Sequence, residues 1–383
     1  MKVGFDAKRA FQNRTGLGNY SRYLIESLCQ HFPNHDYVAY APRPTDEARM
    51  QALLERFPQL SAVFPEGGWP ALWRIKGIAK DLVRDGVDVF HGLSGELPLT
   101  IKETGIPSVV TVHDLIFLRF PQYYSPIDRH IYAYKMRRAC RDATRIIAIS
   151  ECTKRDIVHF FGTDPAKINV IYQGCDPAFT AERDPEFERD VRERFLLPAR
   201  YVLCVGSIEE RKNAGLLVKA LPKLAADVSL VLVGKRTPYT ARIEKEAAAL
   251  GVAERLKVLE DLPFAYLPTV YRMASAFAYP SRYEGFGIPV LEAMRCGVPV
   301  LAATGSCLEE AGGGGALYVH PDDVAGAATA LTRLLCDETL RKGLLEKGTA
   351  YARRFNAETQ AAEVMRVLNE VAATRVFSGH QMK

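Results

Sequence analysis

The chain has 383 residues, 48% hydrophobic and 25% charged, a composition typical of a soluble globular protein of about two domains. A net charge of +5 is too small to indicate a nucleic-acid-binding protein, and no apolar run approaches the roughly 18 residues that cross a bilayer. Residues 1–175 hold 23 Lys and Arg against 18 Asp and Glu, so the excess lies there and would suit acidic lipid or a phosphorylated acceptor.

The N-terminus and the cysteines favour a cytoplasmic protein. Residues 1–6 include an acid and are expected to form a first strand, not a signal peptide. The eight cysteines are scattered singly, without the C-x-x-C spacing of a metal or redox site. Free, buried thiols in a cytoplasmic protein, or in one at the cytoplasmic face of a membrane, are therefore the expectation.

The first half of the chain alternates short apolar strands with helices. The expected strands are Val3–Ala7, Tyr37–Ala41, Val87–His91, Pro107–Val112, Arg145–Ile149 and Ile168–Tyr172. A loop at 13–18 is expected to precede a helix at 19–30, with further helices near 70–84, 127–141 and 151–160. This rhythm predicts a parallel, doubly wound sheet.

The second half repeats the rhythm. The expected strands are Tyr201–Gly206, Ser229–Val233, Leu256–Leu259, Ala276–Tyr279, Pro299–Ala302 and Ala316–Val319. Helices are expected near 213–225, 239–250, 264–273, 289–296 and 323–335, and only helical pattern follows residue 337. We predict an α/β protein with Rossmann-like domains at 1–175 and 200–356, a charged linker with a leading helix at 176–199, and a C-terminal segment at 357–383.

Candidate site residues follow three of the expected strands. Two Rossmann-like domains that face a cleft place ligands at the carboxyl ends of their strands. Glu284, Lys212 and His113 each stand shortly after an apolar strand. These positions predict a ligand site built from strand ends.

Glu284 and Glu292 form the most informative pair. Glu284 precedes a Gly-Phe-Gly turn, and Glu292 lies in the apolar run 288–294, where an unpaired charge costs several kcal/mol. Pro289 suits the first position of a helix. A glycine-rich turn that enters a helix exposes N–H groups and a positive dipole, which is a seat for phosphate. Carboxylates on both sides of such a seat suggest a sugar nucleotide.

Arg211 and Lys212 are adjacent cations at the start of an expected helix. They oppose the helix dipole, so we expect an anion there, the alternative being a solvated pair on a loop. The chain has no D-x-D triplet and no His/Cys cluster with metal spacing. A metal-bridged diphosphate is therefore disfavoured, no cofactor is predicted, and the two cations and the helix dipole would neutralise a leaving group.

His113, Gly16 and Gly18 each have a structural alternative. His113 is either a satisfied core histidine or, as we favour, a partner for sugar or acceptor hydroxyls, whereas Asp114 is expected to cap a turn or helix. Gly16 and Gly18 lack the third glycine of G-x-G-x-x-G. They form either a tight turn or, slightly favoured, a close backbone approach to a ligand.

Two basic, aromatic segments have two interpretations. Residues 69–80 contain both tryptophans, Trp69 and Trp73, together with several cations, and residues 132–145 combine tyrosines with Lys and Arg. Basic amphipathic helices with aromatic residues lie on membrane surfaces. More often, such a helix covers its own sheet or presents a solvated face.

The spacing E-x7-E from Glu284 to Glu292 resembles the signature of family 4 retaining glycosyltransferases, which have the GT-B fold of two Rossmann-like domains. The similarity spans nearly the whole chain. It includes Gly16–Gly18, His113–Asp114, Val205–Gly206, Arg211–Asn213, Val233–Arg236, Tyr279–Ser281 and Cys296–Val300. The forms at 211–213 and 234–236 look closest to bacterial mannosyltransferases of O-antigen and capsule assembly.

The resemblance implies a role for each motif. Glu292 would hold the ribose hydroxyls, Glu284 would lie by the donor hexose, and Lys212 would bind the diphosphate. His113 would reach the donor sugar from the opposite domain. The remaining contacts would come from backbone N–H groups of Phe286, Gly287 and Ile288 to the sugar and diphosphate, and from the loop around Leu262 to the base.

One departure from the family concerns Ser207. Many members carry Arg directly after the glycine equivalent to Gly206, so either Arg211 supplies the missing charge or phosphate binding is weaker. The last helix, about 357–375, would cross back to the first domain, which would bind the acceptor.

The resemblance implies transfer of a hexose, with retention, from a nucleotide diphosphate sugar to a glycan or lipid-linked glycan in surface polysaccharide synthesis. Mannose from GDP-mannose is the preferred donor. Alternatives are a UDP-sugar donor, a sugar-nucleotide epimerase on the same scaffold, and a catalytically silent sugar-nucleotide binder.

Overall fold

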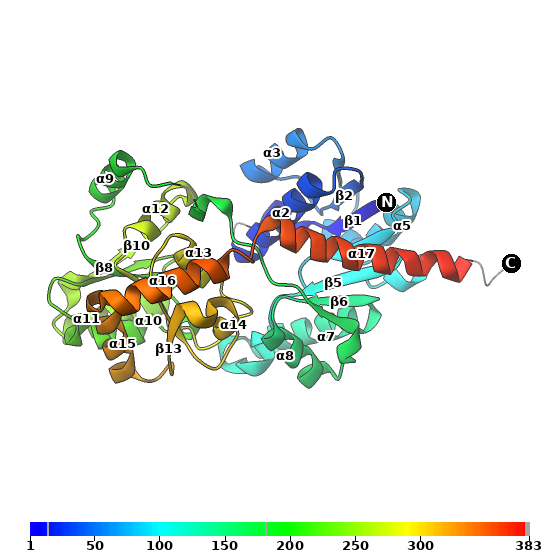
Figure 1. The fold of residues 1–383 in the computed structure, drawn as a ribbon. Helices are drawn as coiled ribbons and strands as arrows, with labels where there is room; N and C mark the ends of the chain where they lie inside the picture. The colour runs from blue at the N-terminus through cyan, green and yellow to red at the C-terminus, as the bar shows by residue number, and fades with distance from the viewer. Residues whose placement is uncertain (14, 181, 380–383) are drawn as a thin grey trace. The chain divides into compact units, whose positions relative to one another are not determined.

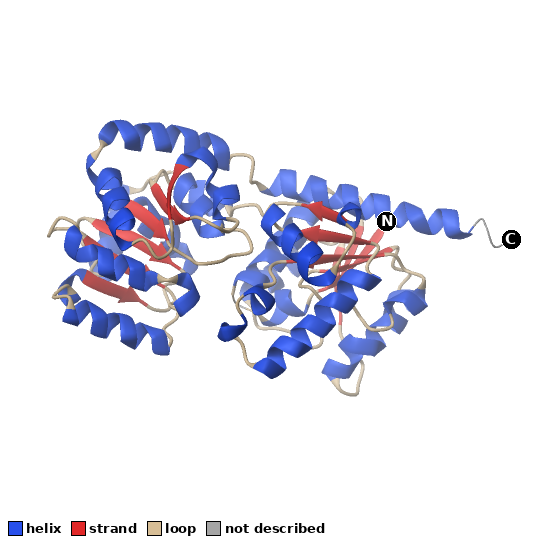
Figure 2. Cartoon of the chain, turned by 90° about the horizontal axis from the view of Figure 1, so that it is seen from below, coloured by secondary structure: helices blue, strands red, loops and turns tan. Residues whose placement is uncertain are grey.

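The computed structural model describes residues 1–13, 15–180 and 182–379, arranged in two compact units (Figure 1). The first unit comprises Met1–Gly174 together with Ala357–Lys383, and the second comprises Cys175–Asn356. In each unit, helices lie on both faces of a parallel sheet (Figure 2). The prediction of a GT-B-type α/β fold with two doubly wound parallel sheets is therefore confirmed.

The sheet of the first unit has the strand order β3-β2-β1-β4-β5-β6-β7 in the described residues, and every neighbouring pair is parallel. Its strands are β1 (Lys2–Asp6), β2 (Asp36–Tyr40), β3 (Leu60–Val63), β4 (Val89–Gly92), β5 (Ser108–Val112), β6 (Arg145–Ala148) and β7 (Ile168–Val170). The strand order reverses at β1, between β2 and β4. The carboxyl ends of β1 and β4 therefore flank the position where doubly wound sheets bind ligands.

The helices of the first unit are α1 (Lys8–Gln12), α2 (Gly16–His31), α3 (Ala48–Arg56), α4 (Pro70–Leu72), a π-helical turn (Trp73–Gly77), α5 (Ile78–Arg84), α6 (Ile116–Arg119), α7 (Pro126–Asp142), α8 (Glu151–Phe161) and α17 (Ala357–Gly379). Helix α17 lies against α2 (Figure 1). Val364 and Leu368 of α17 are buried in the same core as Leu24 and Ile25 of α2. The C-terminal helix is thus part of the hydrophobic core of the first unit.

The second unit repeats the arrangement, with the order β10-β9-β8-β11-β12-β13 in the described residues. Its strands are β8 (Tyr201–Val205), β9 (Ser229–Val233), β10 (Leu256–Leu259), β11 (Ala276–Tyr279), β12 (Val300–Ala303) and β13 (Ala316–Val319). Its helices are α9 (Pro185–Arg194), α10 (Ala214–Ala220), α11 (Pro238–Ala249), α12 (Leu267–Arg272), α13 (Ile288–Arg295), α14 (Leu308–Gly312), α15 (Val324–Cys336) and α16 (Glu338–Ala352). The order reverses at β8, between β9 and β11.

The structure corrects one local expectation and adds elements that were not predicted. Helix α2 begins at Gly16, not near Asn19, so both glycines lie in its first turn. Strand β3 and helices α1 and α3 were not predicted. Strand β3 is a short edge strand in which only Leu60 is buried, so it lacks the apolar run that marks the central strands. The helix expected near 70–84 contains the π-helical turn at Trp73–Gly77. Such a turn has no hydrophobic repeat of its own, so the sequence pattern does not predict it.

All eight cysteines lie among the described residues and are free thiols, six of them buried. This agrees with the expectation of unpaired, mostly buried cysteines. No helix within the described ranges has the length and apolar character that crossing a membrane requires.

Candidate active site

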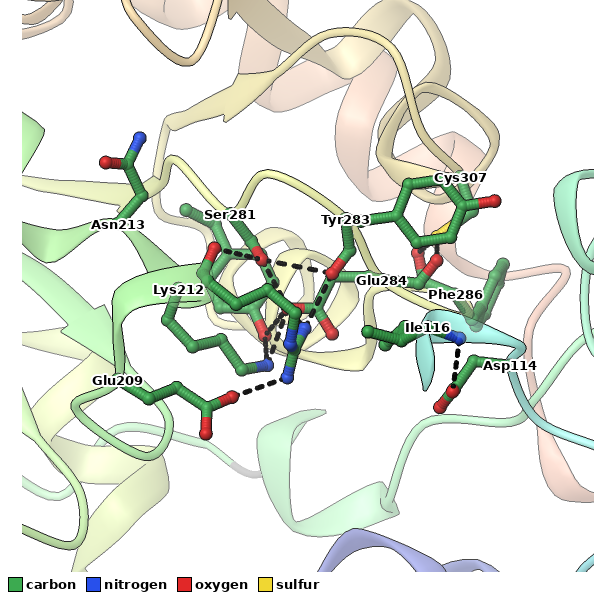
Figure 3. Close-up of polar contacts among 12 residues, drawn as sticks. Asp114, Ile116, Glu209, Lys212, Asn213, Ser281, Tyr283, Glu284, Phe286 and Cys307 are labelled. Carbon is green, nitrogen blue, oxygen red and sulfur yellow. Dashed lines mark hydrogen bonds and ion pairs between the residues drawn. The ribbon is translucent and has the colours of Figure 1, made fainter. Parts of the chain in front are cut away.

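The candidate site lies at the reversal point of the second sheet. Strands β8 and β11 are parallel neighbours, so the loops that follow them lie at the same edge. The loop after β8 carries Arg211 and Lys212, and the loop after β11 carries Ser281 and Glu284. Figure 3 shows the side chains of Lys212, Ser281 and Glu284 converging. The structure therefore brings together the cations and the first glutamate that the sequence pointed to.

Glu284 is held by four donors. Its Oε1 lies 2.6 Å from Lys212 Nζ, 3.0 Å from an Arg211 guanidinium nitrogen, 2.6 Å from Ser281 Oγ and 3.2 Å from Tyr279 Oη. All four contacts are made to this one oxygen, and Figure 3 shows Lys212 and Ser281 beside Glu284. In the part of the chain that the structure describes, Glu284 Oε2 has no hydrogen bond, so it is available to the hydroxyls of a ligand.

The environment of Glu284 fixes its protonation state. Burial alone would raise the pKa of this carboxyl, but the adjacent charges of Lys212 and Arg211 and the hydrogen bonds that it accepts lower the pKa to about 2. Glu284 is therefore a carboxylate at neutral pH. It can accept hydrogen bonds from sugar hydroxyls but cannot donate a proton as a general acid.

Arg211 and Lys212 occupy a short 3-10 turn, Glu210–Lys212, that ends at Asn213. Asn213 has a left-handed backbone with φ of 58°, and its buried amide donates to the carbonyl oxygens of Pro280 at 3.1 Å and Pro321 at 2.7 Å. These bonds tie the cationic turn to the loop of Glu284. Asn213 thus fixes the backbone of the turn that carries Arg211 and Lys212.

The two cations have further partners. Arg211 donates to the Tyr283 carbonyl oxygen at 2.6 Å and to Glu209 Oε1 at 2.6 Å. Lys212 Nζ donates to Tyr279 Oη at 2.5 Å. Ser207, earlier in the same loop, is exposed. Arg211 and Lys212 are the cations of this loop that contact Glu284.

Glycines shape the loops around these charges. Gly206 has φ of 138°, and at Gly234 a Cβ would lie 2.0 Å from the Gly206 carbonyl oxygen. At Gly287 φ is 134°, and a Cβ would lie 2.9 Å from Leu308 Cδ2. Helix α13 begins directly after Gly287, with Pro289 in its first turn. The first N–H groups of a helix have no partner within it. In α13, Pro289 has no N–H and the Val290 N–H donates to the Gly287 carbonyl oxygen at 3.0 Å, so the Ile288 N–H is the donor offered by the start of this helix.

Phe286 is fixed from the other side of the loop. The thiol of Cys307 lies 2.6 Å from the Phe286 carbonyl oxygen and 3.0 Å from that of Glu284. The Phe286 ring contacts the Phe355 ring at a centroid distance of 5.5 Å. The loop that carries Glu284 is thus anchored at its backbone, which leaves the carboxylate in a defined position.

Glu292 has a different environment from Glu284. It lies on α13, half-buried, and accepts a hydrogen bond of 2.7 Å from the hydroxyl of the buried Tyr271. Burial raises the pKa of Glu292 to about 7, and the charge of Asp176 adds to this rise. Within the described residues no cation pairs with Glu292. The cost of placing Glu292 in the apolar run is therefore lowered by the hydrogen bond from Tyr271 and by a raised pKa.

His113 lies in the first unit at the end of β5. Its Nε2 is 2.9 Å from the Leu93 carbonyl oxygen, its Nδ1 is 3.3 Å from the Gln173 amide nitrogen, and its ring meets the Tyr20 ring edge-on. Burial lowers the pKa of His113 to about 4, so the ring is neutral. Both nitrogens have partners inside the unit, and its contact with a sugar stays a prediction.

The remaining predicted residues are spread over both units. Asp114 accepts a hydrogen bond from the Ile116 amide at 3.1 Å, as expected of a cap. At Gly18 a Cβ would lie 1.7 Å from the Asn13 carbonyl oxygen, so this glycine is required by its own loop, whereas Gly16 borders open space. Leu262 is half-buried and lies in the loop that follows β10. A ligand at these three positions stays a prediction.

Sequence reasoning missed several side chains at the site. Tyr279, Ser281 and Tyr271 contact the two glutamates, and Glu209 contacts Arg211. Tyr279 ends an expected strand at the ligand edge, and that position is a signal that could have found it. Tyr271 carries no such signal, because it lies inside a helix on the buried face.

Comparisons with known proteins identify the family. Residues 187–351 match the family described as glycosyl transferases group 1, and residues 14–179 match glycosyltransferase family 4. The chain belongs to glycosyltransferase family 4. This glycosyltransferase is 27% identical to the O-antigen chain mannosyltransferase B of Escherichia coli, over 96% of this chain and 100% of that protein.

Two further comparisons broaden the picture. The D-inositol 3-phosphate glycosyltransferase of Salinispora tropica is 31% identical, over 75% of this glycosyltransferase and 64% of that protein. The crystal structure of Anabaena HepE in complex with UDP and glucose superimposes with a TM-score of 0.75 at 19% identity, covering 97% of this chain and 100% of that one. The structural likeness shows the shared fold.

Proposed function

We propose that this glycosyltransferase moves a hexose, with retention, from a nucleotide diphosphate sugar to a glycan or lipid-linked glycan of a surface polysaccharide. The observation that carries the proposal is the cluster of Lys212, Arg211 and Glu284 at the reversal point of the second sheet. Two cations and a carboxylate with one free oxygen suit a diphosphate joined to a sugar.

Each charged residue has a role in the proposal. The diphosphate lies against Lys212 and Arg211 and against the Ile288 N–H at the start of α13. Glu284 accepts hydrogen bonds from hexose hydroxyls through Oε2, while Oε1 keeps the two cations in place. Glu292, once ionised, accepts hydrogen bonds from the ribose hydroxyls. In the first unit, His113 meets the donor sugar.

The chemical step needs charge stabilisation more than proton donation. The bond between the anomeric carbon and the diphosphate oxygen breaks, and the acceptor oxygen bonds to the same face of that carbon. The acceptor's proton passes to the leaving phosphate oxygen. Lys212 and Arg211 stabilise the charge that builds up on the diphosphate. Glu284 stays ionised throughout, since its pKa is about 2.

The same cations support a metal-independent reaction. Glu284 holds both side chains at the reversal point of the second sheet, where we place the diphosphate. Among the described residues, no group of three or more His, Cys, Asp and Glu side chains is placed to hold a metal ion. We therefore assign neutralisation of the leaving group to Lys212, Arg211 and the start of α13.

GDP-mannose is the proposed donor, supported by the full-length similarity to an O-antigen mannosyltransferase. A UDP-sugar is the second candidate, because the structurally similar HepE was solved with UDP and glucose. A thermal-shift screen with GDP, UDP and ADP separates them. A ligand at 100 times its dissociation constant adds about 2.7 kcal/mol of stability. No shift with any of the three would sink the proposal.

An epimerase on this scaffold is separated by its products. It would consume the nucleotide sugar without an acceptor and release a different sugar nucleotide. The proposed transferase releases a nucleoside diphosphate in step with acceptor glycosylation, and a silent binder releases none. Chromatography of the products with and without acceptor distinguishes these three outcomes.

Peripheral contact with the cytoplasmic face of a membrane is part of the proposal. Among the described residues of the first unit, the exposed large apolar side chains all lie within 69–83 and 127–134. Trp69 is 82% exposed and Ile127 is 73% exposed, and both segments also carry Lys or Arg. Sedimentation with anionic vesicles tests this contact. Loss of binding in Trp69→Ser with Ile127→Ser would support it, and equal sedimentation would contradict it.

A further inference from the structure

The first unit contains two adjoining cavities that the donor chemistry does not use. One has a volume of about 340 Å³ and the other about 280 Å³, and both are lined by Arg74, Ile75 and Lys135. Asp6, the last residue of β1, lines the larger cavity. Together they form a two-part cavity near the carboxyl end of β1, where the strand order reverses. Doubly wound sheets bind ligands at this edge.

The larger part has apolar walls. Leu97 and Leu99, which follow β4, line it together with Ile75 from the π-helical turn and Ile131 and Tyr134 from α7. Ile131 is 45% exposed and Tyr134 is 60% exposed. The apolar surface of this part is therefore accessible from solvent, and a hydrocarbon chain would cover it favourably.

The smaller part is cationic. Its lining includes Lys8, Arg43, Arg74 and Lys135 and no carboxylate. Arg74 is already neutralised, because its guanidinium lies 2.6 Å from Asp6 and 2.6 Å from Glu96.

Two of these cations lack a counter-charge. In the part of the chain that the structure describes, neither Lys8 Nζ nor the Arg43 guanidinium forms an ion pair. Burial and the charge of Arg74 lower the pKa of Lys8, and the carboxylates of Glu96 and Asp6 offset only part of this effect. The smaller part thus has the electrostatics of a phosphate site.

We propose that the two-part cavity binds a phosphate or diphosphate attached to a hydrocarbon chain, which is the lipid end of a lipid-linked glycan acceptor. The phosphate lies against Lys8 and Arg43, and the chain lies along Ile75, Ile131 and Tyr134. This inference rests on the proposed function and names the chemical class of its acceptor. A soluble sugar phosphate would leave the apolar walls uncovered.

Calorimetric titration with three soluble probes tests the assignment: farnesyl diphosphate, inorganic pyrophosphate and farnesol. Farnesyl diphosphate is expected to bind at least about tenfold more tightly than pyrophosphate, because only it covers the apolar walls. Lys8→Ala with Arg43→Ala should weaken both diphosphates about tenfold or more. Ile131→Ser should weaken farnesyl diphosphate alone.

Matched variants separate the cavity from the surface around it. Lys80→Ala removes an exposed cation of α5 outside the cavity, and Ile127→Ser removes an exposed apolar side chain of the same α7. Neither should change the affinity for farnesyl diphosphate. Equal effects of the control and cavity variants, or equal affinities for pyrophosphate and farnesyl diphosphate, would overturn the proposal.

Two further measurements keep this inference distinct from the donor site and from a bulk membrane. Farnesyl diphosphate should bind Lys212→Ala protein as tightly as wild type, and loss of binding there would place the probe at the donor site instead. Vesicles of phosphatidylglycerol test the other source. If Lys8 and Arg43 proved necessary for vesicle binding but not for farnesyl diphosphate, the cavity assignment would fail.

Failure of this inference and failure of the proposed function look different. A nucleotide-dependent thermal shift without farnesyl diphosphate binding overturns the lipid site and leaves the transferase standing. Farnesyl diphosphate binding without any nucleotide-dependent thermal shift contradicts the proposed transferase function. The bound lipid could then no longer be assigned as an acceptor.

Discussion

Lys212 Nζ lies 2.6 Å from Glu284 Oε1 although the two residues belong to different loops, one after β8 and one after β11. Both side chains are largely buried, at 16% and 12% exposure. Such a pair is not a surface salt bridge. Removing one partner leaves the other charge buried, which is the costly case.

Lys212→Ala should lower kcat by about 10²–10³, because removal of one preorganised group that stabilises transition-state charge has an effect of that size. Initial rates of nucleoside diphosphate release under saturating donor measure the change. Lys219→Ala, an exposed cation of α10 that pairs with Glu246, is the matched control and should keep the wild-type rate. A wild-type kcat in Lys212→Ala would remove the role assigned to this residue.

The free energy of unfolding should fall in acid through Glu284. Its pKa is about 2 in the folded protein and near 4.5 in an unfolded chain. The stabilisation is therefore complete above pH 4.5 and is lost as pH falls toward 2. Between pH 5 and pH 3 this single group should contribute a loss of about 2 kcal/mol.

Urea denaturation at the two pH values measures this loss. Glu284→Gln should be less stable than wild type at pH 7, because Lys212 and Arg211 lose their counter-charge, and its stability should fall less between pH 5 and pH 3. Glu244→Gln, at an exposed ion pair with Arg236, should keep the wild-type pH dependence. Identical pH slopes for wild type and Glu284→Gln would contradict the assignment.

Glu292 should make nucleotide binding depend on pH near neutrality, with weaker binding at lower pH. Its pKa of about 7 means that about a tenth of the molecules carry the carboxylate at pH 6. If the ribose hydroxyls require that carboxylate, the apparent dissociation constant should be about tenfold weaker at pH 6 than at pH 8. Proton release on binding, detected by calorimetry in buffers of different ionisation enthalpy, is the direct measurement.

Two checks make the Glu292 prediction specific. Glu292→Gln should bind more weakly and show no such pH dependence. The raised pKa also means that the folded protein binds a proton more tightly than the unfolded chain, so this group's contribution to stability should decrease as pH rises from 4.5 to 7. A flat binding profile in the wild-type protein would show that Glu292 does not anchor the ribose.

Much of this arrangement could be predicted from the sequence, because apolar strands at a regular spacing fix a parallel sheet and place loop residues at one edge. Arg211, Lys212 and Glu284 were found in this way. The partners Tyr271 and Ser281 were not, because which hydroxyl reaches a carboxylate depends on side-chain directions that no local pattern encodes. Glu292 shows the same limit: the apolar run indicated that its charge needs relief but not that a tyrosine provides it.

Gly18 shows why a glycine motif is ambiguous from sequence. The residue was expected to allow close approach of a ligand, and the structure shows its Cβ position filled by the Asn13 carbonyl of the same loop. Both situations demand a missing side chain and leave the same letter in the sequence. Gly287, with its positive φ and its contact to Leu308, is a further case in which the protein's own packing requires the glycine.

The pair of Ser207 and Arg211 allows a test of whether one cation has replaced another. Arg211 contacts the same Glu284 oxygen as Lys212, whereas Ser207 is exposed on the loop before it. Arg211→Ala should weaken binding of the nucleoside diphosphate by about tenfold, the effect of losing one charge-assisted contact. Ser207→Arg in the Arg211→Ala protein should restore most of that affinity, because the new guanidinium would extend from the same loop after β8.

Calorimetric titration of the wild type, the two single variants and the double variant gives the coupling energy between positions 207 and 211. Ser207→Lys serves as the control, since a flexible point charge should restore less than the planar guanidinium. If Arg211→Ala bound the nucleotide as tightly as wild type, Arg211 would not be the substitute for the missing arginine, and Lys212 with the start of α13 would hold the diphosphate alone.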